Sequence, residues 1–115
     1  MYISKFTSEA VEQIKKLPKG VRNALKKAFK KTLLENPTSC ADELTEPLAG
    51  FRSFHFGDYR VVYRVYEDLN AIAVVGVGKK DAHAETDLYR KLEKLASTGK
   101  LADKVLKSLR LIAAP

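Results

Sequence analysis

Sulfur and tryptophan are scarce in this sequence, whose 115 residues include one cysteine, one methionine and no tryptophan. The lone Cys40 has no second cysteine to pair with, which excludes a disulfide-stapled secreted scaffold and a cysteine-rich zinc module. The two histidines, His55 and His83, are too few and too far apart in the sequence to indicate a metal site. We therefore expect neither a bound metal nor another cofactor.

Long apolar runs are also missing. No stretch approaches the roughly 18 apolar residues that a membrane helix needs, and the opening MYISKFTSEA lacks the charged and then apolar layout of a signal peptide. These absences predict a cytoplasmic protein without membrane segments. The chain is long enough for one ordinary hydrophobic core and too short for two, so we expect a single domain over residues 1–115.

Acidic side chains are absent from one stretch of the chain. Overall there are 21 Lys and Arg against 14 Asp and Glu, a net charge of +7. Between Ile14 and Leu34 every charged residue is basic, including Lys26, Lys27, Lys30 and Lys31. Such a surface is either a solvated helix face or a contact surface for RNA or DNA, and both interpretations stay open at this point.

The first half of the chain predicts one strand and two helices. Residues 2–6 are rich in β-formers, and Thr7 or Ser8 can cap a helix that continues to about residue 16. After a Pro-Lys-Gly break, apolar residues recur at helical spacing over residues 21–33, up to Asn36-Pro37. The short connection predicts an antiparallel helical hairpin. Residues 38–50 predict a loop with a short extended stretch near 44–48.

The second half begins with a change of apolar period to two, which indicates strands. Residues 51–56 and 59–66 flank a Gly-Asp turn, and the valine-rich residues 71–77 predict a strand that is buried on both faces and ends at Gly78. Together with the first half, this order predicts an α+β fold. In that fold the N-terminal strand and helical hairpin pack on a mainly antiparallel sheet, with additional C-terminal helices.

The C-terminal part is helical in composition and follows a loop at residues 79–86. A break at Ser97-Thr98-Gly99 separates two helices, of which the second, residues 100–115, is a C-terminal extension. Its apolar stripe contains Leu101, Val105, Leu109 and Ile112. Because this stripe cannot stand free in water, we expect it to pack back on the domain; docking on a second chain is the alternative.

The segment from Gly50 to Tyr66 reads GFRSFHFGDYRVVYRVY, and VVGVGKK follows at residues 74–80. With Leu48, the Asn36-Pro37 exit and Tyr89, this series resembles the RelE/ParE superfamily of bacterial toxins over about residues 2–89. The resemblance implies the toxin of a type II toxin–antitoxin pair, with an antitoxin protein as partner. RelE-like members are mRNA interferases that cut mRNA on the ribosome, whereas ParE-like members poison DNA gyrase and are not nucleases.

Our leading expectation is a metal-independent, ribosome-dependent mRNA endonuclease, a hydrolase that binds RNA. The alternatives are a ParE-like inhibitor of DNA gyrase, or a degenerate member that only binds its antitoxin. RNA cleavage requires transfer of two protons and stabilisation of charge on the phosphate. Arg60 suits the charge-stabilising role because a guanidinium is always charged and matches phosphate geometry.

The resemblance also suggests Lys80 as a phosphate ligand and Tyr89 as a tyrosine of the site. RelE-like nucleases tend to carry two basic residues at alternating positions before the turn, where this chain has Ser53 and His55. His55 is suited to proton transfer near neutral pH. An outward polar residue remains the alternative for His55, as does a packed helix aromatic for Tyr89.

The remaining candidates are basic residues that would bind RNA. On alternating spacing, Arg64 shares a sheet face with Arg60, while Arg52 is one step out of phase with Ser53 and His55. We assign RNA binding to Arg52, Arg64, Lys79, Lys26, Lys27, Lys30 and Lys31. His83, in the expected 79–86 loop, is either incidental or a further proton-transfer candidate.

Overall fold

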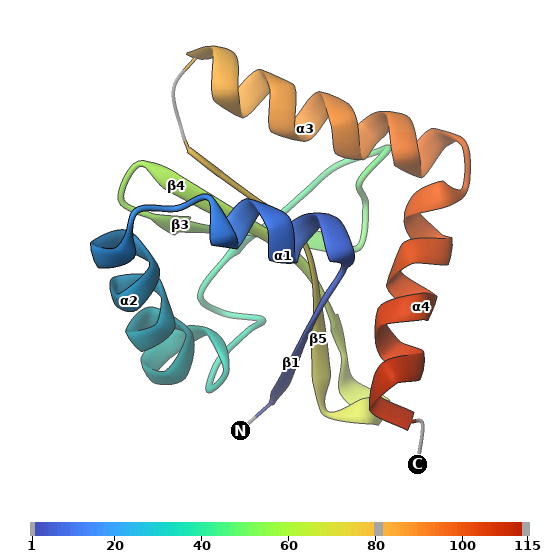
Figure 1. The fold of residues 1–115 in the computed structure, drawn as a ribbon. Helices are drawn as coiled ribbons and strands as arrows, with labels where there is room; N and C mark the ends of the chain where they lie inside the picture. Colours follow the sequence, from blue (N-terminus) through green and yellow to red (C-terminus); the bar gives the residue numbers. More distant parts are fainter. Residues whose placement is uncertain (1, 80–81, 114–115) are drawn as a thin grey trace.

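The computed structural model describes residues 2–79 and 82–113, with side chains described for residues 2–79 and 88–109. A mixed sheet lies between two layers of helices (Figure 1). Its strand order is β1-β5-β4-β3-β2, in which only the β1–β5 pair is parallel. The strands are β1 (Ile3–Phe6), β2 (Asp42–Glu43), β3 (Phe51–Phe56), β4 (Tyr59–Tyr66) and β5 (Ala71–Lys79). The predicted α+β fold is confirmed.

The helices divide between the two faces of the sheet. On one face lie α1 (Ser8–Lys15), α2 (Lys19–Ala28) and a π-helical turn (Phe29–Leu33); on the other lie α3 (Ala82–Ser97) and α4 (Lys100–Ala113). A short 3₁₀ turn, Glu67–Leu69, joins β4 to β5. Figure 1 shows α2 crossing the direction of α1, not returning along it as an antiparallel partner. Both helices bury apolar residues against the sheet, which sets their directions separately.

Several element boundaries differ from the sequence predictions. The strand in the loop region lies earlier than the extended stretch expected near residues 44–48, because β2 consists of Asp42 and Glu43. The strand β5 continues past the predicted end at Gly78 to Lys79. The expected 79–86 loop is shorter, because α3 already begins at Ala82. The predicted helix break is confirmed: α3 ends at Ser97, and Gly99 reverses the chain with φ +77°.

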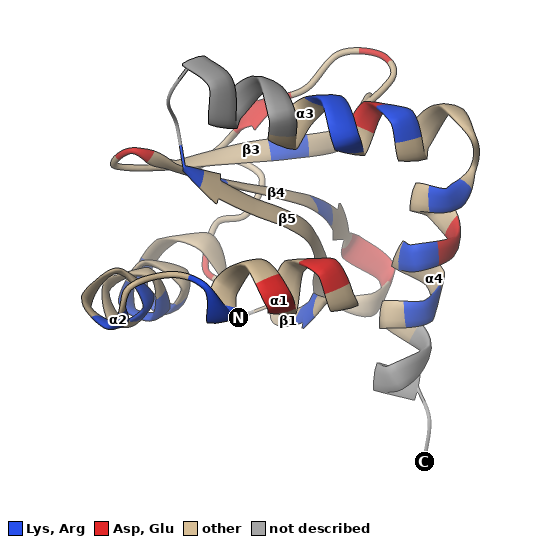
Figure 2. Ribbon diagram, turned by 45° about the horizontal axis from the view of Figure 1, so that its top comes forward, with Lys and Arg blue, Asp and Glu red and all other residues tan. Residues whose placement is uncertain are grey.

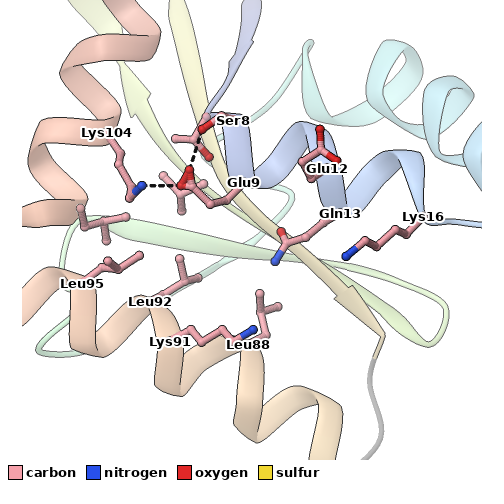
Figure 3. A pocket seen from close by; sticks show the side chains of 13 residues that line it. Ser8, Glu9, Glu12, Gln13, Lys16, Leu88, Lys91, Leu92, Leu95 and Lys104 are labelled. Carbon is pink, nitrogen blue, oxygen red and sulfur yellow. Dashed lines mark hydrogen bonds and ion pairs between the residues drawn. The ribbon is translucent and has the colours of Figure 1, made fainter.

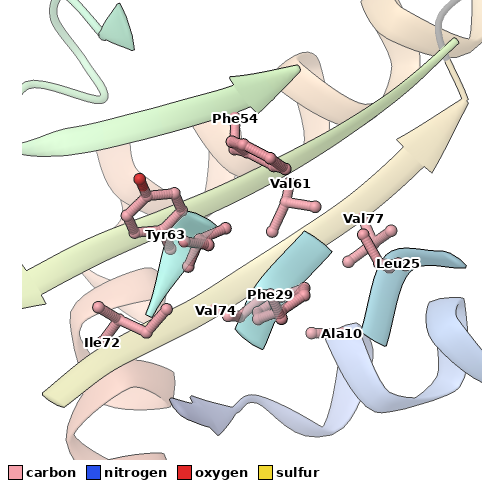
Figure 4. Packing of buried hydrophobic residues seen from close by; sticks show 10 residues of the cluster. Ala10, Leu25, Phe29, Phe54, Val61, Tyr63, Ile72, Val74 and Val77 are labelled. Carbon is pink, nitrogen blue, oxygen red and sulfur yellow. The ribbon is translucent and has the colours of Figure 1, made fainter. Parts of the chain in front are cut away.

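The core beneath α1 and α2 is built from alternate residues of the inner strands (Figure 4). Val61 and Tyr63 from β4 and Val74 from β5 meet Leu25 and Phe29 from the helical layer. All three strand residues are fully buried. The Tyr63 hydroxyl donates to the carbonyl oxygen of Pro37, so the core aromatic also fixes the segment that follows the π-helical turn.

A β-bulge changes the phase of β5. Val62 lies opposite Gly76, but the next residue, Tyr63, lies opposite Val74, which leaves Val75 as an extra residue. As a result both Val75 and Gly76 face α3, while Val77 faces the other core. The register shift therefore brings Gly76 and Gly78 beneath α3 without interrupting the burial of the flanking valines.

The second core holds α3 and α4 against the other face of the sheet. Leu88 and Leu92 of α3 pack with Leu101 and Val105 of α4, and each of these side chains is at most 6% exposed. Lys104 also donates to a carboxylate oxygen of Glu9 in α1. This hydrogen bond, aided by one from Ser8, lowers the pKa of Glu9. The pair borders a cavity of about 320 Å³ whose floor is apolar (Figure 3).

Alkaline pH should reveal the burial of Tyr63. Burial, and then its contact with Cys40, raises the pKa of the Tyr63 phenol far above its ordinary value of 10.0. Below about pH 10 the phenol is neutral in both states and its contribution is complete; at higher pH the unfolded chain loses this proton while the folded chain keeps it. Stability should therefore fall by up to about 1.4 kcal/mol per pH unit from this group.

Urea unfolding of the parent and of Tyr63→Phe across this range tests the prediction. The variant should start less stable, by about 1 kcal/mol at neutral pH, because the Pro37 carbonyl loses its donor. Its alkaline decline should then be shallower than that of the parent. If the stability of the parent and of Tyr63→Phe fell equally at alkaline pH, the raised pKa would not belong to Tyr63.

Candidate active site

The β3–β4 hairpin places two of the predicted site residues, His55 and Arg60, on the sheet face that α3 covers. His55 lies directly opposite Arg60 across the two strands, and Arg60 lies opposite Gly78 of β5. Residues directly opposite one another share a sheet face. Ser53, two residues before His55, faces the same way and meets Tyr89 of α3.

Arg60 is the most enclosed charged residue of this group. Only 4% of its surface is exposed. One terminal guanidinium nitrogen, Nη1, donates to the carbonyl oxygens of Tyr59 at 2.9 Å and Gly57 at 3.2 Å, which ties the side chain to the hairpin turn. Its Nε is buried and has no hydrogen-bond partner among the described residues. Arg60 therefore combines a structural contact with an unused donor.

A hydrogen bond joins α3 to the sheet. The hydroxyl oxygens of Ser53 and Tyr89 are 2.7 Å apart. Ser53 is 2% exposed, and Tyr89 is half-buried beside the second core. The Tyr89 ring packs beside the second core, while its hydroxyl reaches Ser53 in β3. Sequence reasoning did not assign Ser53 a role, although its alternation with His55 was the available signal.

His55 is the accessible member of the group. Its Nε2 lies 3.5 Å from Oδ2 of Asp42 in β2, and their side chains are 53% and 80% exposed. Sequence reasoning missed Asp42, because a two-residue strand inside a polar loop leaves no periodic signal. Water screens a pair this exposed, so its contribution to stability is small. Within the described residues, no group of three or more His, Cys, Asp or Glu gathers as a metal site requires.

The other predicted residues are dispersed. Arg64 is exposed on the Arg60 face, with its guanidinium carbon 5.8 Å from the ring centroid of Phe51 and 5.5 Å from that of Tyr66. Arg52 lies on the opposite face and donates to the carbonyl oxygen of Ala41 at 3.2 Å. Lys79 is exposed at the end of β5, opposite Tyr59 and therefore also on the far face. Lys80 and the side chain of His83 lie outside the described residues.

The basic surface lies apart from these residues. Figure 2 shows basic positions along α2, on the opposite side of the sheet from α3. The four candidate RNA-binding lysines of this surface are exposed, two in α2 and two in the π-helical turn: Lys26, Lys27, Lys30 and Lys31. No helix in the described part of the chain is long and apolar enough to cross a membrane.

Residues 5–84 match the profile of the family described as the ParE toxin of the type II toxin–antitoxin system parDE. This chain belongs to the ParE toxin family. The match runs from within β1 to the beginning of α3 and includes the β3–β4 hairpin that carries Arg60 and His55. Membership of the RelE/ParE superfamily, predicted from the motif series, is thereby confirmed.

Known relatives of this ParE-family toxin include proteins named RelE. Toxin RelE of Mycobacterium tuberculosis is 28% identical over 76 residues, which cover 66% of this chain and 78% of the relative. The toxin–antitoxin complex RelBE2 from the same organism contains a chain with 26% identity and a TM-score of 0.65; 69% of this chain matches 98% of that one. The intact Escherichia coli RelBE complex gives 29% identity, a TM-score of 0.61, and coverage of 70% and 99%.

These coverages show that the ParE-family toxin is longer than the solved chains it resembles. Nearly all of each solved chain is matched by about 70% of this one. The family match itself stops at residue 84, shortly after α3 begins. The helix α4 lies wholly beyond the matched residues.

Proposed function

We propose that this toxin is a metal-independent, ribosome-dependent endonuclease that cuts mRNA, and that a cognate antitoxin protein restrains it. The observation that carries the proposal is that His55, Arg60 and the Ser53–Tyr89 hydrogen bond lie on one face of the β3–β4 hairpin. Such a group supplies a proton-transfer residue, a phosphate-binding cation and a hydroxyl. The relatives named RelE and the solved complexes with antitoxins support the same class.

The proposed roles follow from the surroundings of each side chain. His55 moves a proton because it is the exposed imidazole beside the site. Arg60 stabilises charge on the non-bridging phosphate oxygens, which a guanidinium matches with paired donors. The Tyr89 hydroxyl, held by Ser53, positions the ribose or the leaving oxygen. Lys80 remains a proposed phosphate ligand on the strength of the sequence resemblance.

Replacing His55 should slow cleavage without unfolding the toxin. Its side chain is more than half exposed, so His55→Ala removes little packing. A true acid or base contributes about 10²-fold or more, so single-turnover cleavage on programmed ribosomes should fall by at least that factor. Asp42→Asn is the matched control, since it removes the neighbouring carboxylate but leaves the imidazole. An unchanged rate for His55→Ala would make His55 a polar surface residue.

A second candidate function, inhibition of DNA gyrase, is favoured by one observation. Arg60 is buried and bound to two carbonyl oxygens, as expected of a residue that stabilises the hairpin turn. In that case the target is a protein, and no proton-transfer group is needed. Induced expression with parallel mapping of mRNA 5′ ends and of plasmid supercoiling separates the two functions. Cleaved mRNA with normal supercoiling supports the nuclease, and the reverse pattern supports gyrase inhibition.

The basic surface of α2 and the π-helical turn should contribute affinity for RNA and no chemistry. We expect the quadruple change of Lys26, Lys27, Lys30 and Lys31 to Gln to weaken ribosome binding and to flatten its salt dependence. The maximal cleavage rate of this variant should equal that of the parent. A matched control changes four other exposed lysines, Lys16, Lys94, Lys100 and Lys107, with the same loss of charge. If ribosome binding by the two variants depended equally on salt concentration, the four lysines would be only a solvated face.

A further inference from the structure

A second arginine lies on the Arg60 face of β4. Side chains alternate along a strand, so Arg60 and Arg64 point to the same side of the sheet, and Arg64 lies directly opposite Phe51 in β3. Four residues of extended strand span roughly 13 Å. At that separation the two guanidinium groups cannot hold one phosphate, but they can contact different nucleotides of a single RNA strand.

Two aromatic rings and a glycine hold the Arg64 side chain. Its guanidinium carbon lies over the ring of Phe51, 5.8 Å from the centroid, and over the ring of Tyr66, 5.5 Å from the centroid. A β-carbon on Gly50 would lie 3.5 Å from Cζ of Arg64, so the guanidinium also rests against the backbone before Phe51. Both rings pack with the second core, and Phe51 is 7% exposed. The rings are therefore a fixed support for the cation.

The N–H donors of Arg64 have no protein partner within the described part of the chain. A guanidinium carries five such donors. Arg52 binds the carbonyl oxygen of Ala41 and Arg60 binds the hairpin turn, but no hydrogen bond or ion pair joins Arg64 to another described residue. Arg64 is nevertheless exposed. The rings thus fix the guanidinium without satisfying its donors, and they leave a flat, charged group accessible to a ligand.

A nucleobase suits this group better than a phosphate does. In single-stranded RNA, splayed bases pack on aromatic rings and on the planes of guanidinium groups. A phosphate is attracted by any nearby cation and gains nothing from the flatness of the support. A base gains from the charge and from the flat surface, and because Phe51 and Tyr66 already immobilise the guanidinium, little conformational freedom is lost on binding.

We propose that Arg64, supported by Phe51 and Tyr66, is a stacking site for one nucleobase of a single-stranded RNA. The site adds affinity and fixes the position of the strand along the β3–β4 hairpin. Because Arg64 shares the Arg60 face, this base belongs to a nucleotide that flanks the phosphate at Arg60. That placement rests on the proposed function, whereas the stacking of a base does not.

Oligomers with and without bases separate stacking from a phosphate contact. We expect the purified toxin to bind an oligoadenylate about tenfold more tightly than an oligomer of equal length and charge made of the abasic analogue tetrahydrofuran, a difference typical of one stacked base. Arg64→Lys keeps the charge and loses the planar group. It should bind the abasic oligomer as the parent does, but lose about fivefold or more in affinity for the oligoadenylate. Fluorescence anisotropy of labelled oligomers measures both affinities.

Two further variants accompany this comparison. Arg90→Lys makes the same change at an exposed arginine of α3, so it should leave both affinities unchanged. Tyr66→Leu removes one supporting ring and keeps Arg64, so it should also weaken binding of the oligoadenylate alone. Thermal unfolding verifies that each variant is folded. If Tyr66→Leu does not fold, Arg64→Lys still decides, because its side chain lies at the surface.

Cleavage on programmed ribosomes separates the stacking site from the proposed function. For Arg64→Lys we expect KM to rise about fivefold, with kcat close to that of the parent, because the site binds a flanking base. Base-dependent binding with no cleavage by the parent would overturn the nuclease and support the stacking site. Cleavage by the parent, with equal oligoadenylate affinities for the parent and Arg64→Lys, would overturn the stacking site alone.

Two other results would also overturn the stacking site. An equal loss of affinity for both oligomers in Arg64→Lys would make Arg64 a phosphate contact. Unchanged RNA binding together with weaker inhibition of DNA gyrase would make the Arg64 surface a contact for a protein.

Discussion

Arg60→Ala is expected to abolish growth inhibition and to lower single-turnover mRNA cleavage by about 10²- to 10³-fold, the loss typical of removing one donor to a transition-state oxyanion. Arg60→Lys should restore little of this rate, because an ammonium lacks the planar pair of donors that a phosphate accepts. Both rates are measured on programmed ribosomes with purified protein, and growth inhibition is measured on induced expression.

Folding of the variant must be measured alongside, because Arg60 also binds the hairpin turn. Loss of its bonds to Gly57 and Tyr59 should cost about 1–3 kcal/mol, which thermal unfolding will show. Arg90→Ala is the matched control, since it removes an exposed guanidinium from α3. Full toxicity in a folded Arg60→Ala protein would assign Arg60 a purely structural role.

Leu101→Ala should be the most destabilising single truncation in α4. Leu101 is 2% exposed and joins α4 to the core beneath α3. Truncation of a buried leucine typically costs about 2–5 kcal/mol, a large share of the roughly 5–15 kcal/mol that stabilises a small domain. Urea unfolding monitored by circular dichroism measures the change.

Leu106→Ala provides the comparison within the same helix. Leu106 is 53% exposed, so its truncation should change the free energy of unfolding by no more than about 0.5 kcal/mol. Equal effects of the two truncations would mean that α4 is not packed on this domain. A large loss for Leu101 alone would show that the extension beyond the family match stabilises the fold.

The sequence was most informative where a regular pattern met a clear interruption. Alternating residues from Phe51 onward located β3 and β4, and the break at Ser97, Thr98 and Gly99 located the boundary between α3 and α4. The bulge at Val75 could not be predicted, because one additional valine in a run of apolar residues does not disturb its composition. It is tertiary packing that decides which face each valine takes.

The candidate site was predictable in its residue types but not in its accessibility. The motif identified Arg60, and the departure from the RelE-like pattern before the turn identified His55, which the structure shows to be the register partner of Arg60. The burial of Arg60 appears only in the folded chain, and the close approach of α3 to Gly76 and Gly78 likewise joins segments that are distant in the sequence. From the sequence alone, a glycine that ends a strand cannot be told from a glycine against which a helix packs.

The parallel pairing of β1 with β5 has a consequence for how the toxin is synthesised. Ile3 lies opposite Ala71 and Phe6 opposite Val74, so the first strand made is paired with the last. During translation β1 has no partner until β5 has left the ribosomal exit tunnel, and this non-local contact closes late. The ribosome that makes the toxin therefore carries a chain with an incomplete sheet for most of its synthesis.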